Sequence, residues 1–370
     1  MNVIIRADAS IHIGLGHLAR CQTLAVALRE QGVTVRFISR ALPGHQIATL
    51  RAQGFRVAVL PAPPDQNVID GDYAAWLGVT QAQDAQETIA ALTNQRPDWL
   101  IVDHYALDAE WEQTLRPHVG RILIIDDLAN RRHDADLLLD QNYAPGSATR
   151  YQGLLPPDTR TLLGPTYALL RPEYAHYRQT LRPRDGNVRR VLVFFGGTDP
   201  QNISGRVLTA LSDPALAHLE VDLVIGANHP QREDLTTRAT ARPFTRVHGP
   251  RPHLADLMAT ADLAIGAGGT TTWERCCLGL PSLVVSIADN QRPTCIALAA
   301  DGLFHYVGHH DRMTSWTLLT AILQLLSNPV SLRALSKAGA DLVDAGGTKR
   351  IIWNMNELMH GQAGMQEQVP

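Results

Sequence analysis

The sequence has little charge imbalance and few aromatic residues, and each shortage argues against a class of partner. Its 370 residues include 33 Lys and Arg against 36 Asp and Glu, a net charge of −3 at pH 7. Proteins that bind nucleic acid through its phosphates usually carry a basic excess, so no nucleic-acid partner is predicted. Aromatic residues make up only 5% of the chain, which is too few for a platform on which bases stack.

Long apolar runs and metal-type cysteine spacings are also missing. No stretch of about 18 uncharged apolar residues occurs, so we expect no transmembrane helix and no membrane insertion. The first apolar run, Val3–Ile5, ends at Arg6, which does not fit a signal peptide. The cysteines match neither a zinc site nor a disulfide framework, so no metal is predicted and a reducing cytoplasm is the expected compartment. They are Cys21, Cys276, Cys277 and Cys295.

What the sequence does have is a regular alternation of short β-branched runs with longer helical patterns. This alternation is typical of α/β proteins with parallel sheets and crossover helices. Between the first two runs, residues 17–31 carry apolar side chains every three or four positions, which predicts a helix. The expected strands are Asn2–Ala7, Val33–Ser39, Arg56–Leu60, Trp99–Asp103, Arg121–Asp126, Leu137–Asp140, Thr161–Leu163, Val188–Phe195, Val221–Ile225, Arg246–Val247, Leu263–Ile265, Ser282–Ser286 and His305–Val307.

A stretch rich in Pro and Arg, residues 171–186, interrupts this alternation and is predicted to be an interdomain linker. The chain is long enough for two domains of ordinary size. We therefore expect one Rossmann-like domain over residues 1–170 and a second over residues 187–345. Residues 346–370 are expected to form a C-terminal helix and a disordered tail.

Three glycine-rich turns follow predicted strands. They are Gly14-Leu15-Gly16-His17, Gly196-Gly197-Thr198-Asp199-Pro200, and the run from Gly266 to Thr272. Ligands of open α/β sheets bind at the carboxyl ends of the strands, and glycines let backbone N–H groups approach a phosphate. Two such turns in the second domain favour a ligand with a diphosphate. Tight strand-to-helix connections that bind nothing are the alternative.

The first turn also matches the dinucleotide fingerprint, over Gly14 to Ala19. Two features count against that interpretation. Six residues separate the strand end from Gly14, and the second strand ends in Ser39-Arg40, with no acidic residue for a ribose. We therefore expect no nicotinamide or flavin cofactor.

His17 stands in the first turn of the predicted helix, beside two glycines. A helix N-terminus disfavours the imidazolium form, so the ring should be neutral near pH 7 and able to accept a proton. This makes His17 a candidate general base, with Asp8 of the preceding loop expected to orient the ring. A helix-capping histidine is the alternative.

Other polar side chains follow predicted strands. Asp103-His104-Tyr105 and Asp289-Asn290-Gln291 are expected to face an interdomain cleft, and ordinary loop polarity is the alternative. Asp126-Asp127 also ends a strand. Paired carboxylates suit glycoside hydrolysis or a metal, although helix capping explains the pair as well.

Together these segments resemble the UDP-2,4-diacetamido-2,4,6-trideoxy-β-L-altropyranose hydrolase family of pseudaminic acid biosynthesis. The resemblance covers about residues 1–345. It rests on Arg6–Asp8, Gly14–Cys21, Asp103–Tyr105, Gly196–Asp199, Gly266–Glu274 and Asp289–Gln291. That family is similar in turn to the glycosyltransferase that adds N-acetylglucosamine in peptidoglycan synthesis. The resemblance therefore implies the GT-B fold, two doubly wound Rossmann-like domains facing across a cleft.

The resemblance also implies a reaction, in which water attacks the anomeric carbon of a UDP-sugar, UDP leaves and the configuration inverts. His17 would be the base, while Tyr105 and Asn290 would position water and sugar. Because UDP is already a good leaving group, charge stabilisation suffices and no cofactor is expected. Glu274 would suit the ribose hydroxyls. The implied substrate contacts are Arg6, Asp8, Gly16, Arg171, Gly197, Thr198, Gly268, Gly269, Thr270, Thr271, Glu274 and Gln291.

Two other functions stay open on the sequence. A glycosyltransferase would use the same fold and a UDP-sugar donor, but would need a groove for its acceptor. A binding module without catalysis would hold a UDP-sugar and not turn it over. Release of free sugar and UDP without any acceptor would distinguish the hydrolase from both.

Overall fold

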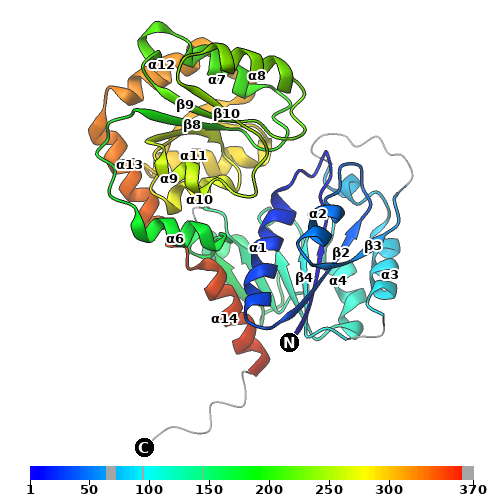
Figure 1. Ribbon diagram of the computed structural model, residues 1–370. Coiled ribbons are helices and arrows are strands. Elements are labelled where there is room, and N and C mark those ends of the chain that lie inside the picture. Colours follow the sequence, from blue (N-terminus) through cyan, green and yellow to red (C-terminus); the bar gives the residue numbers. More distant parts are fainter. Residues whose placement is uncertain (64–71, 94–95, 145, 361–370) are drawn as a thin grey trace, which may run out of the picture. The chain divides into compact units, whose positions relative to one another are not determined.

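The computed structural model describes residues 1–63, 72–93, 96–144 and 146–360, which form two compact α/β units (Figure 1). Of the described residues, unit 1 comprises 1–63, 72–93, 96–142, 146–169 and 346–360, and unit 2 comprises 143–144 and 170–345. Both sheets are entirely parallel, and helices cover both faces of each. The α/β architecture expected from the alternating pattern is confirmed.

The sheet of unit 1 has seven strands in the order β3-β2-β1-β4-β5-β6-β7. Its two central strands, β1 and β4, pair from Val3 with Trp99 to Ala7 with Asp103. Because both faces of these strands are covered, they are continuous apolar runs instead of alternating ones. The strands are β1 (Asn2–Ala7), β2 (Thr34–Arg40), β3 (Arg56–Leu60), β4 (Trp99–Asp103), β5 (Arg121–Ile125), β6 (Leu137–Asp140) and β7 (Arg160–Leu163).

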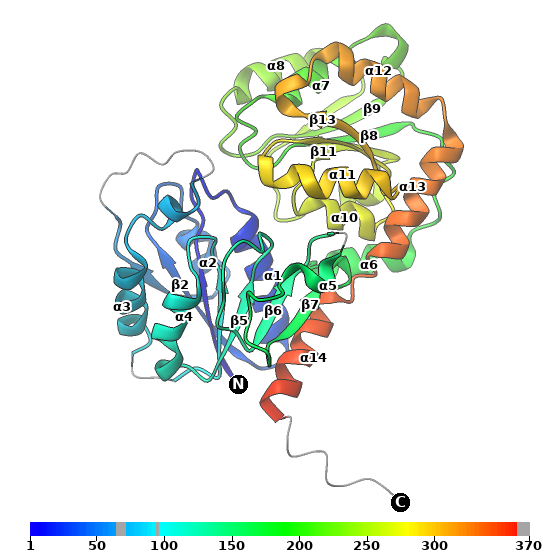
Figure 2. The same ribbon diagram turned by 180° about the vertical axis from the view of Figure 1, so that it is seen from behind.

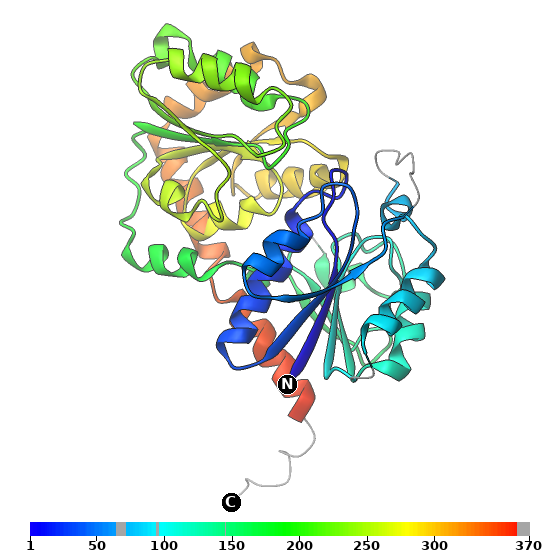
Figure 3. The ribbon, with the colours of Figure 1, turned by 45° about the vertical axis from the view of Figure 1, so that its right-hand side comes forward.

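Helices α1 and α14 pack on one face of this sheet, as Figures 1 and 3 both show, while α3 and α4 pack on the other. The last helix thus returns to unit 1, where Ile351, Ile352 and Met355 join its core. The helices and 3₁₀ turns are α1 (Gly16–Glu30), α2 (Ile47–Ala52), η1 (Ala74–Leu77), α3 (Gln81–Ala91), α4 (Ala109–Leu115), η2 (Arg116–His118), α5 (Ser147–Arg150), η3 (Pro165–Tyr167) and α14 (Gly347–His360).

The sheet of unit 2 has six strands in the order β10-β9-β8-β11-β12-β13. Figure 2 shows α11 and α10 along one face of this sheet and α7, α8 and α12 along the other. The strands are β8 (Arg190–Phe194), β9 (Glu220–Val224), β10 (Thr245–His248), β11 (Leu263–Ala267), β12 (Ser282–Ser286) and β13 (His305–His309). The strand order reverses between β1 and β4 in unit 1 and between β8 and β11 in unit 2. Folds of this kind bind ligands at such a reversal.

Short helices and turns complete unit 2. They are α6 (Pro172–Thr180), α7 (Ile203–Leu211), η4 (Pro214–Leu216), α8 (Arg232–Ala241), α9 (Ala255–Thr260), α10 (Thr271–Cys277), η5 (Asp289–Gln291), α11 (Arg292–Ala300), η6 (His310–Arg312), α12 (Ser315–Leu326) and α13 (Pro329–Leu342).

The predicted linker differs from the structure. Residues 171–186 carry helix α6, which packs on α9 and α10 and belongs to unit 2. The sequence pattern was interpreted as a break at Pro172 because proline interrupts a helix from within. Here Pro172 is the first residue of α6, a position where proline is favoured. Every predicted strand is present, with ends moved by at most two residues. The predicted disordered tail, residues 361–370, lies outside the described residues.

Among the described residues, no single helix is both long enough and apolar enough to cross a bilayer. One pair, Ser315–Leu326 with Pro329–His360, meets the criteria of length and composition together but is bent by 91°.

Candidate active site

His17 is the second residue of α1, at the carboxyl edge of the sheet of unit 1. Its side chain is almost buried, and its Nδ1 lies 2.6 Å from Oδ1 of Asp103, the last residue of β4. Sequence reasoning assigned the orienting role to Asp8, and that assignment is wrong. Strand pairing brings Asp103 to the ring instead, because β4 lies directly beside β1.

Arg20 fixes the carboxylate that holds His17. One helical turn after the histidine, its Nε and Nη2 donate to the two oxygens of Asp103 at 2.6 and 2.7 Å, and its Nη1 donates to Asp127 at 2.9 Å. Burial alone would raise the pKa of Asp103, but Arg20 and His17 outweigh it and hold that pKa well below its usual range. Asp103 is therefore ionised throughout the neutral range.

The proton position on His17 follows from this ionised partner. A carboxylate accepts hydrogen bonds and donates none, so Nδ1 carries the proton of the neutral ring and Nε2 keeps its lone pair. Arg20 Nη2 also lies 3.3 Å from Nδ1, on the same side of the ring as Asp103. The imidazole is thus held in the tautomer that a general base requires.

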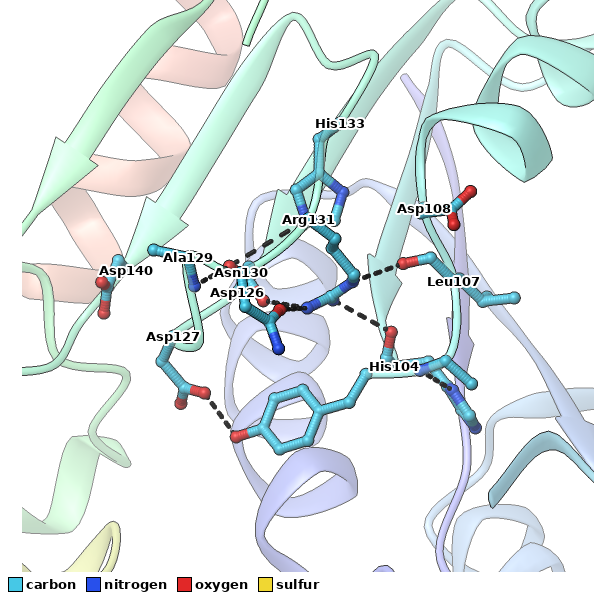
Figure 4. A network of polar contacts seen from close by, with 12 residues as sticks. His104, Leu107, Asp108, Asp126, Asp127, Ala129, Asn130, Arg131, His133 and Asp140 are labelled. Carbon is cyan, nitrogen blue, oxygen red and sulfur yellow. Dashed lines mark hydrogen bonds and ion pairs between the residues drawn. The ribbon is translucent and has the colours of Figure 1, made fainter. Parts of the chain in front are cut away.

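Tyr105 stands next to His17, with its ring edge-on at 4.5 Å between centroids. Its hydroxyl donates to Asp127, a contact drawn at Asp127 in Figure 4. Burial, and then the nearby Asp127 charge, raise the pKa of Tyr105 well above its ordinary value, so this phenol stays neutral. Trp76 of η1 stacks on Tyr105 at 5.5 Å between centroids and also meets the ring of His17 edge-on at 6.2 Å.

Three groups of this cluster escaped the sequence reasoning as site residues: Arg20, Asp127 and Trp76. Arg20 follows His17 by three positions, so helical spacing alone could have placed both on one face of α1. Asp127 was considered only as half of a carboxylate pair, and Trp76 lies in a short 3₁₀ turn with no pattern around it. Their convergence depends on strand order, which the sequence pattern did not reveal.

Arg6 and Asp8, predicted to contact substrate, are completely buried. Arg6 binds Asp84 through Nη2 at 2.7 Å and Asp8 through Nη1 at 2.7 Å. Asp8 also accepts a hydrogen bond from the backbone N–H of Arg40 at 2.7 Å. With no exposed atom, neither can touch a ligand in this structure, so that prediction is wrong for both.

The carboxylates of Asp126 and Asp127 serve separate partners. Arg131 donates to Asp126 at 2.8 Å and also to the carbonyl of Leu107, as Figure 4 shows. Asp127 pairs with Arg20 and Tyr105. Among the described residues, no group of three or more His, Cys, Asp or Glu side chains is placed to hold a metal ion. Each carboxylate is therefore committed to a local cation or hydroxyl, which does not favour the glycosidase or metal interpretation.

The two glycine turns of unit 2 differ in how their backbone amides are used. After β8, the buried Asp199 accepts hydrogen bonds from the N–H groups of Ile203 and Ser204, both at 2.9 Å. A carboxylate therefore already occupies the start of α7. Gly197, predicted to hold the diphosphate, and Thr198, predicted to contact the substrate, lie just before this internal cap.

The turn after β11 carries no such acidic cap. Gly268, Gly269 and Thr270 connect Ala267 to α10, and no side chain caps the helix at Thr270. A Cβ at Gly268 would overlap the sulfur of Cys295, so only glycine lets the backbone run this close to α11. The predicted residues Gly268 to Thr271 thus form one tight turn at the carboxyl edge of the sheet.

Other predicted contacts surround this turn within unit 2. Gln291 accepts a hydrogen bond from Ile287 N–H at 3.0 Å, and its Nε2 lies 3.5 Å from where a Cβ on Gly269 would be. Glu274 of α10 hydrogen-bonds Tyr174, and desolvation raises the pKa of Glu274 to about 7. Arg171 precedes α6 and pairs with Glu173 at 3.3 Å.

Two predicted residues remain, one in each unit. Asn290 is exposed in η5 of unit 2, while Gly16 begins α1 beside His17. The structure therefore groups His17 and Tyr105 in unit 1 and Gly268 to Thr271, Glu274 and Gln291 in unit 2. Any joint action of Asn290 with His17 stays a prediction.

Comparison with known proteins finds relatives by sequence, while no family model matches the chain. The spore coat polysaccharide biosynthesis protein SpsG of Bacillus subtilis is 24% identical over 362 residues, which cover 97% of this chain and 98% of SpsG. The UDP-2,4-diacetamido-2,4,6-trideoxy-β-L-altropyranose hydrolase of Campylobacter jejuni is 25% identical over 303 residues. The match covers 82% of this chain and 97% of the hydrolase.

Solved structures give the fold. The structure of the glycotransferase of kitacinnamycin superposes with a TM-score of 0.66 at 18% identity, covering 96% of this chain and 98% of that one. Together with two parallel, helix-covered sheets, this likeness establishes two Rossmann-like units. The chain is a distant sequence relative of the Campylobacter jejuni hydrolase and of SpsG, and its fold is GT-B.

Proposed function

We propose that this protein is an enzyme that hydrolyses a UDP-sugar to UDP and free sugar. The observation that carries the proposal is the contact of His17 Nδ1 with the ionised Asp103. It fixes the ring orientation and leaves Nε2 as a proton acceptor. A base held in this way suits activation of water, and general-base help of this kind is worth about 10²- to 10⁴-fold in rate.

In the proposed reaction, the oxygen of water forms a bond to the anomeric carbon as the bond from that carbon to the diphosphate oxygen breaks. His17 Nε2 takes a proton from the water, and the electron pair leaves with UDP. Attack from the face opposite the leaving group inverts the configuration. The imidazolium, stabilised by Asp103, returns its proton to solvent.

Within this proposal, unit 2 binds the nucleotide. Gly268 to Thr271 would hold the diphosphate through backbone amides, together with Gly197 and Thr198. Glu274 would accept hydrogen bonds from the ribose hydroxyls, and Arg171 and Gln291 would contact the substrate. Tyr105, a neutral phenol beside His17, would position water or sugar with Asn290.

The specific sugar rests on the sequence relative. The Campylobacter jejuni protein is a UDP-2,4-diacetamido-2,4,6-trideoxy-β-L-altropyranose hydrolase, and the match covers most of both chains. We therefore propose a UDP-linked 2,4-diacetamido-2,4,6-trideoxy sugar as substrate, and a place in pseudaminic acid biosynthesis. SpsG, whose name refers to a spore coat polysaccharide, is consistent with a role in making surface glycans.

A panel of UDP-sugars without any acceptor tests the proposal. We expect stoichiometric UDP and free sugar from the diacetamido-trideoxy sugar and much slower release from UDP-N-acetylglucosamine. Equal rates on all UDP-sugars would reject the specific substrate. No release from any would reject hydrolysis.

Glycosyl transfer is the alternative, favoured by the structural likeness to a glycotransferase. A transferase would release UDP only when an acceptor is added. A binding module would hold UDP tightly and release no sugar under either condition. The same panel, repeated with extracted cell-surface glycan precursors as acceptors, distinguishes these functions.

A further inference from the structure

Arg275, on α10 of unit 2, is a buried cation bound only to neutral groups. Its side chain is 3% exposed. Nη2 donates to the carbonyl of Ala267 at 2.9 Å and to Thr272 Oγ1 at 3.1 Å, and Nη1 donates to Thr271 Oγ1 at 3.2 Å. Its Nε has no hydrogen-bond partner among the described residues. No carboxylate of these residues forms an ion pair with it.

The acidic groups nearest in sequence offset this charge only in part. Glu274 hydrogen-bonds Tyr174, and desolvation raises its pKa to about 7, so much of it is neutral at neutral pH. Burial raises the pKa of the Cys276 thiol to about 11 and that of Cys295 to about 12, so neither is a thiolate. A buried charge without a counter-charge costs several kcal/mol, so its presence calls for a compensating group.

The guanidinium lies directly beneath the third glycine turn. Ala267, whose carbonyl it holds, is the last residue of β11, and Nη1 lies 2.9 Å from where a Cβ on Gly266 would be. Thr271 and Thr272, its hydroxyl partners, follow the same turn. Any anion on the outer side of the turn would therefore face a positive charge through one layer of backbone.

The other glycine turn of this sheet lacks such a charge. There Asp199 brings a buried carboxylate to the backbone amides, with His229 at 3.4 Å from it. Helix α10 has only seven residues, so its dipole alone is a weak attraction for an anion. Of the two turns, only the one over Arg275 combines an uncapped glycine backbone with a buried cation that forms no ion pair among the described residues.

We propose that Arg275 is the electrostatic support of the Gly266–Thr270 turn, to which the proposed function assigns the diphosphate of the nucleotide. The inference rests on the proposed function only for the identity of the ligand. Arg275 acts as a positioning residue. It holds the turn through hydrogen bonds to Ala267, Thr271 and Thr272, and its positive charge attracts the ligand without direct contact. Ligand binding then supplies the counter-charge that the free protein lacks.

The test compares two buried arginines of unit 2 that carry the same charge. Arg242 is 7% exposed and also donates only to neutral groups, among them the carbonyls of Leu211, Leu216 and Leu219. It precedes β10, at the opposite edge of the sheet from the glycine turns. Arg275→Met, Arg275→Lys and the control Arg242→Met are titrated calorimetrically with UDP, uridine and inorganic pyrophosphate, and their thermal unfolding is recorded.

We expect Arg275→Met to weaken UDP binding at least tenfold, about 1.4 kcal/mol, while uridine affinity changes by less than twofold. Arg275→Lys should recover part of the loss, since it keeps the charge. Arg242→Met should bind UDP like the wild type even if it unfolds at a lower temperature. Unchanged UDP affinity in Arg275→Met, or equal losses for UDP and uridine in a folded variant, would overturn the inference.

Failure of the proposed function has a separate signature. The wild type could bind pyrophosphate in a manner that depends on Arg275, yet bind UDP no more tightly than pyrophosphate and uridine not at all. In that case the anion subsite stands and the UDP-sugar function falls. If the protein binds UDP equally with and without Arg275, only the role of Arg275 falls. If it binds none of the three ligands, both fall.

Discussion

The buried arginines of the two units differ in the groups that they bind. In unit 1, Arg6, Arg20 and Arg40 each make ion pairs with two carboxylates. In unit 2, Arg242 and Arg275 donate to backbone carbonyls and threonine hydroxyls. In the first arrangement every buried guanidinium is paired with carboxylates, while in the second the guanidinium forms no ion pair with a described residue.

This difference indicates a division of labour. Paired charges fix geometry, and in unit 1 they hold Asp103 and through it the ring of His17. Unpaired positive charge attracts anions, and in unit 2 it lies under a glycine turn. The same residue type thus orients a base in one unit and prepares a subsite for a diphosphate in the other.

The strongest way to break this comparison is to remove the base. His17→Ala should lower turnover about 10²- to 10⁴-fold, because proton transfer is assigned to unit 1, while UDP affinity, assigned to unit 2, stays within twofold. The fold should survive, since Arg20 still neutralises Asp103. Steady-state kinetics and calorimetric UDP titration check both parts. His118→Ala, an exposed histidine of the same unit, is the control, and activity equal to that control would remove His17 from the mechanism.

A second experiment makes the same substitution in both units. Arg20→Met should cost about 3–5 kcal/mol of unfolding free energy, because it leaves buried carboxylates without their cation. Arg242→Met should cost about 1–3 kcal/mol, since only hydrogen bonds to neutral carbonyls are lost. Urea unfolding followed by circular dichroism measures both. A larger loss in Arg242→Met than in Arg20→Met would contradict the comparison.

Asp103 of unit 1 and Glu274 of unit 2 should respond to pH with opposite sign. Arg20 holds the pKa of Asp103 below its unfolded value, so that stabilisation is present at neutral pH and is lost as the pH falls below about 4. Desolvation raises the pKa of Glu274 from 4.5 to about 7, so its contribution is complete below 4.5 and is lost as the pH rises through 7.

Glu274→Gln isolates the second effect. Without ligand, the decline in wild-type stability between pH 5 and pH 7 should become shallower in the variant, by at most about 1.4 kcal/mol per pH unit for one proton. Thermal unfolding across this range is the measurement. A variant whose stability falls as steeply as that of the wild type would show that Glu274 does not titrate in this way.

The smallest expected effect concerns the aromatic support of the base. Trp76 stacks on Tyr105, which in turn contacts His17. Trp76→Leu should lower kcat a few-fold, in keeping with about 0.5–1.5 kcal/mol for an aromatic pair. Trp316→Leu, a tryptophan 72% exposed on unit 2, should leave kcat unchanged. Equal kcat values in the two variants would show that the stack does not support the site.

The sequence patterns predicted the features that depend on neighbouring residues. The strands, the helix that begins near His17 and the glycine turns are each encoded within a few residues, and the predicted strands are all present. The partner of His17 is not local, because Asp103 lies 86 residues away and meets it only through the pairing of β4 with β1.

For Arg6 and Asp8, the sequence predicted a contact that the structure does not allow, again because distant residues decide the outcome. Both belong to a motif that matches the family, so the sequence predicted that they contact substrate. Their burial follows from the central position of β1 and from Asp84, 78 residues from Arg6 on α3. A motif records which residues recur together, but not whether they face a ligand or each other.

Hydrolysis in ¹⁸O-labelled water, with the UDP-linked diacetamido-trideoxy sugar and no acceptor, tests the central claim most directly. The account predicts one UDP and one free sugar per turnover, with the label in the sugar, and loss of both products in His17→Ala. Label in UDP, or UDP release only after an acceptor is added, would contradict it.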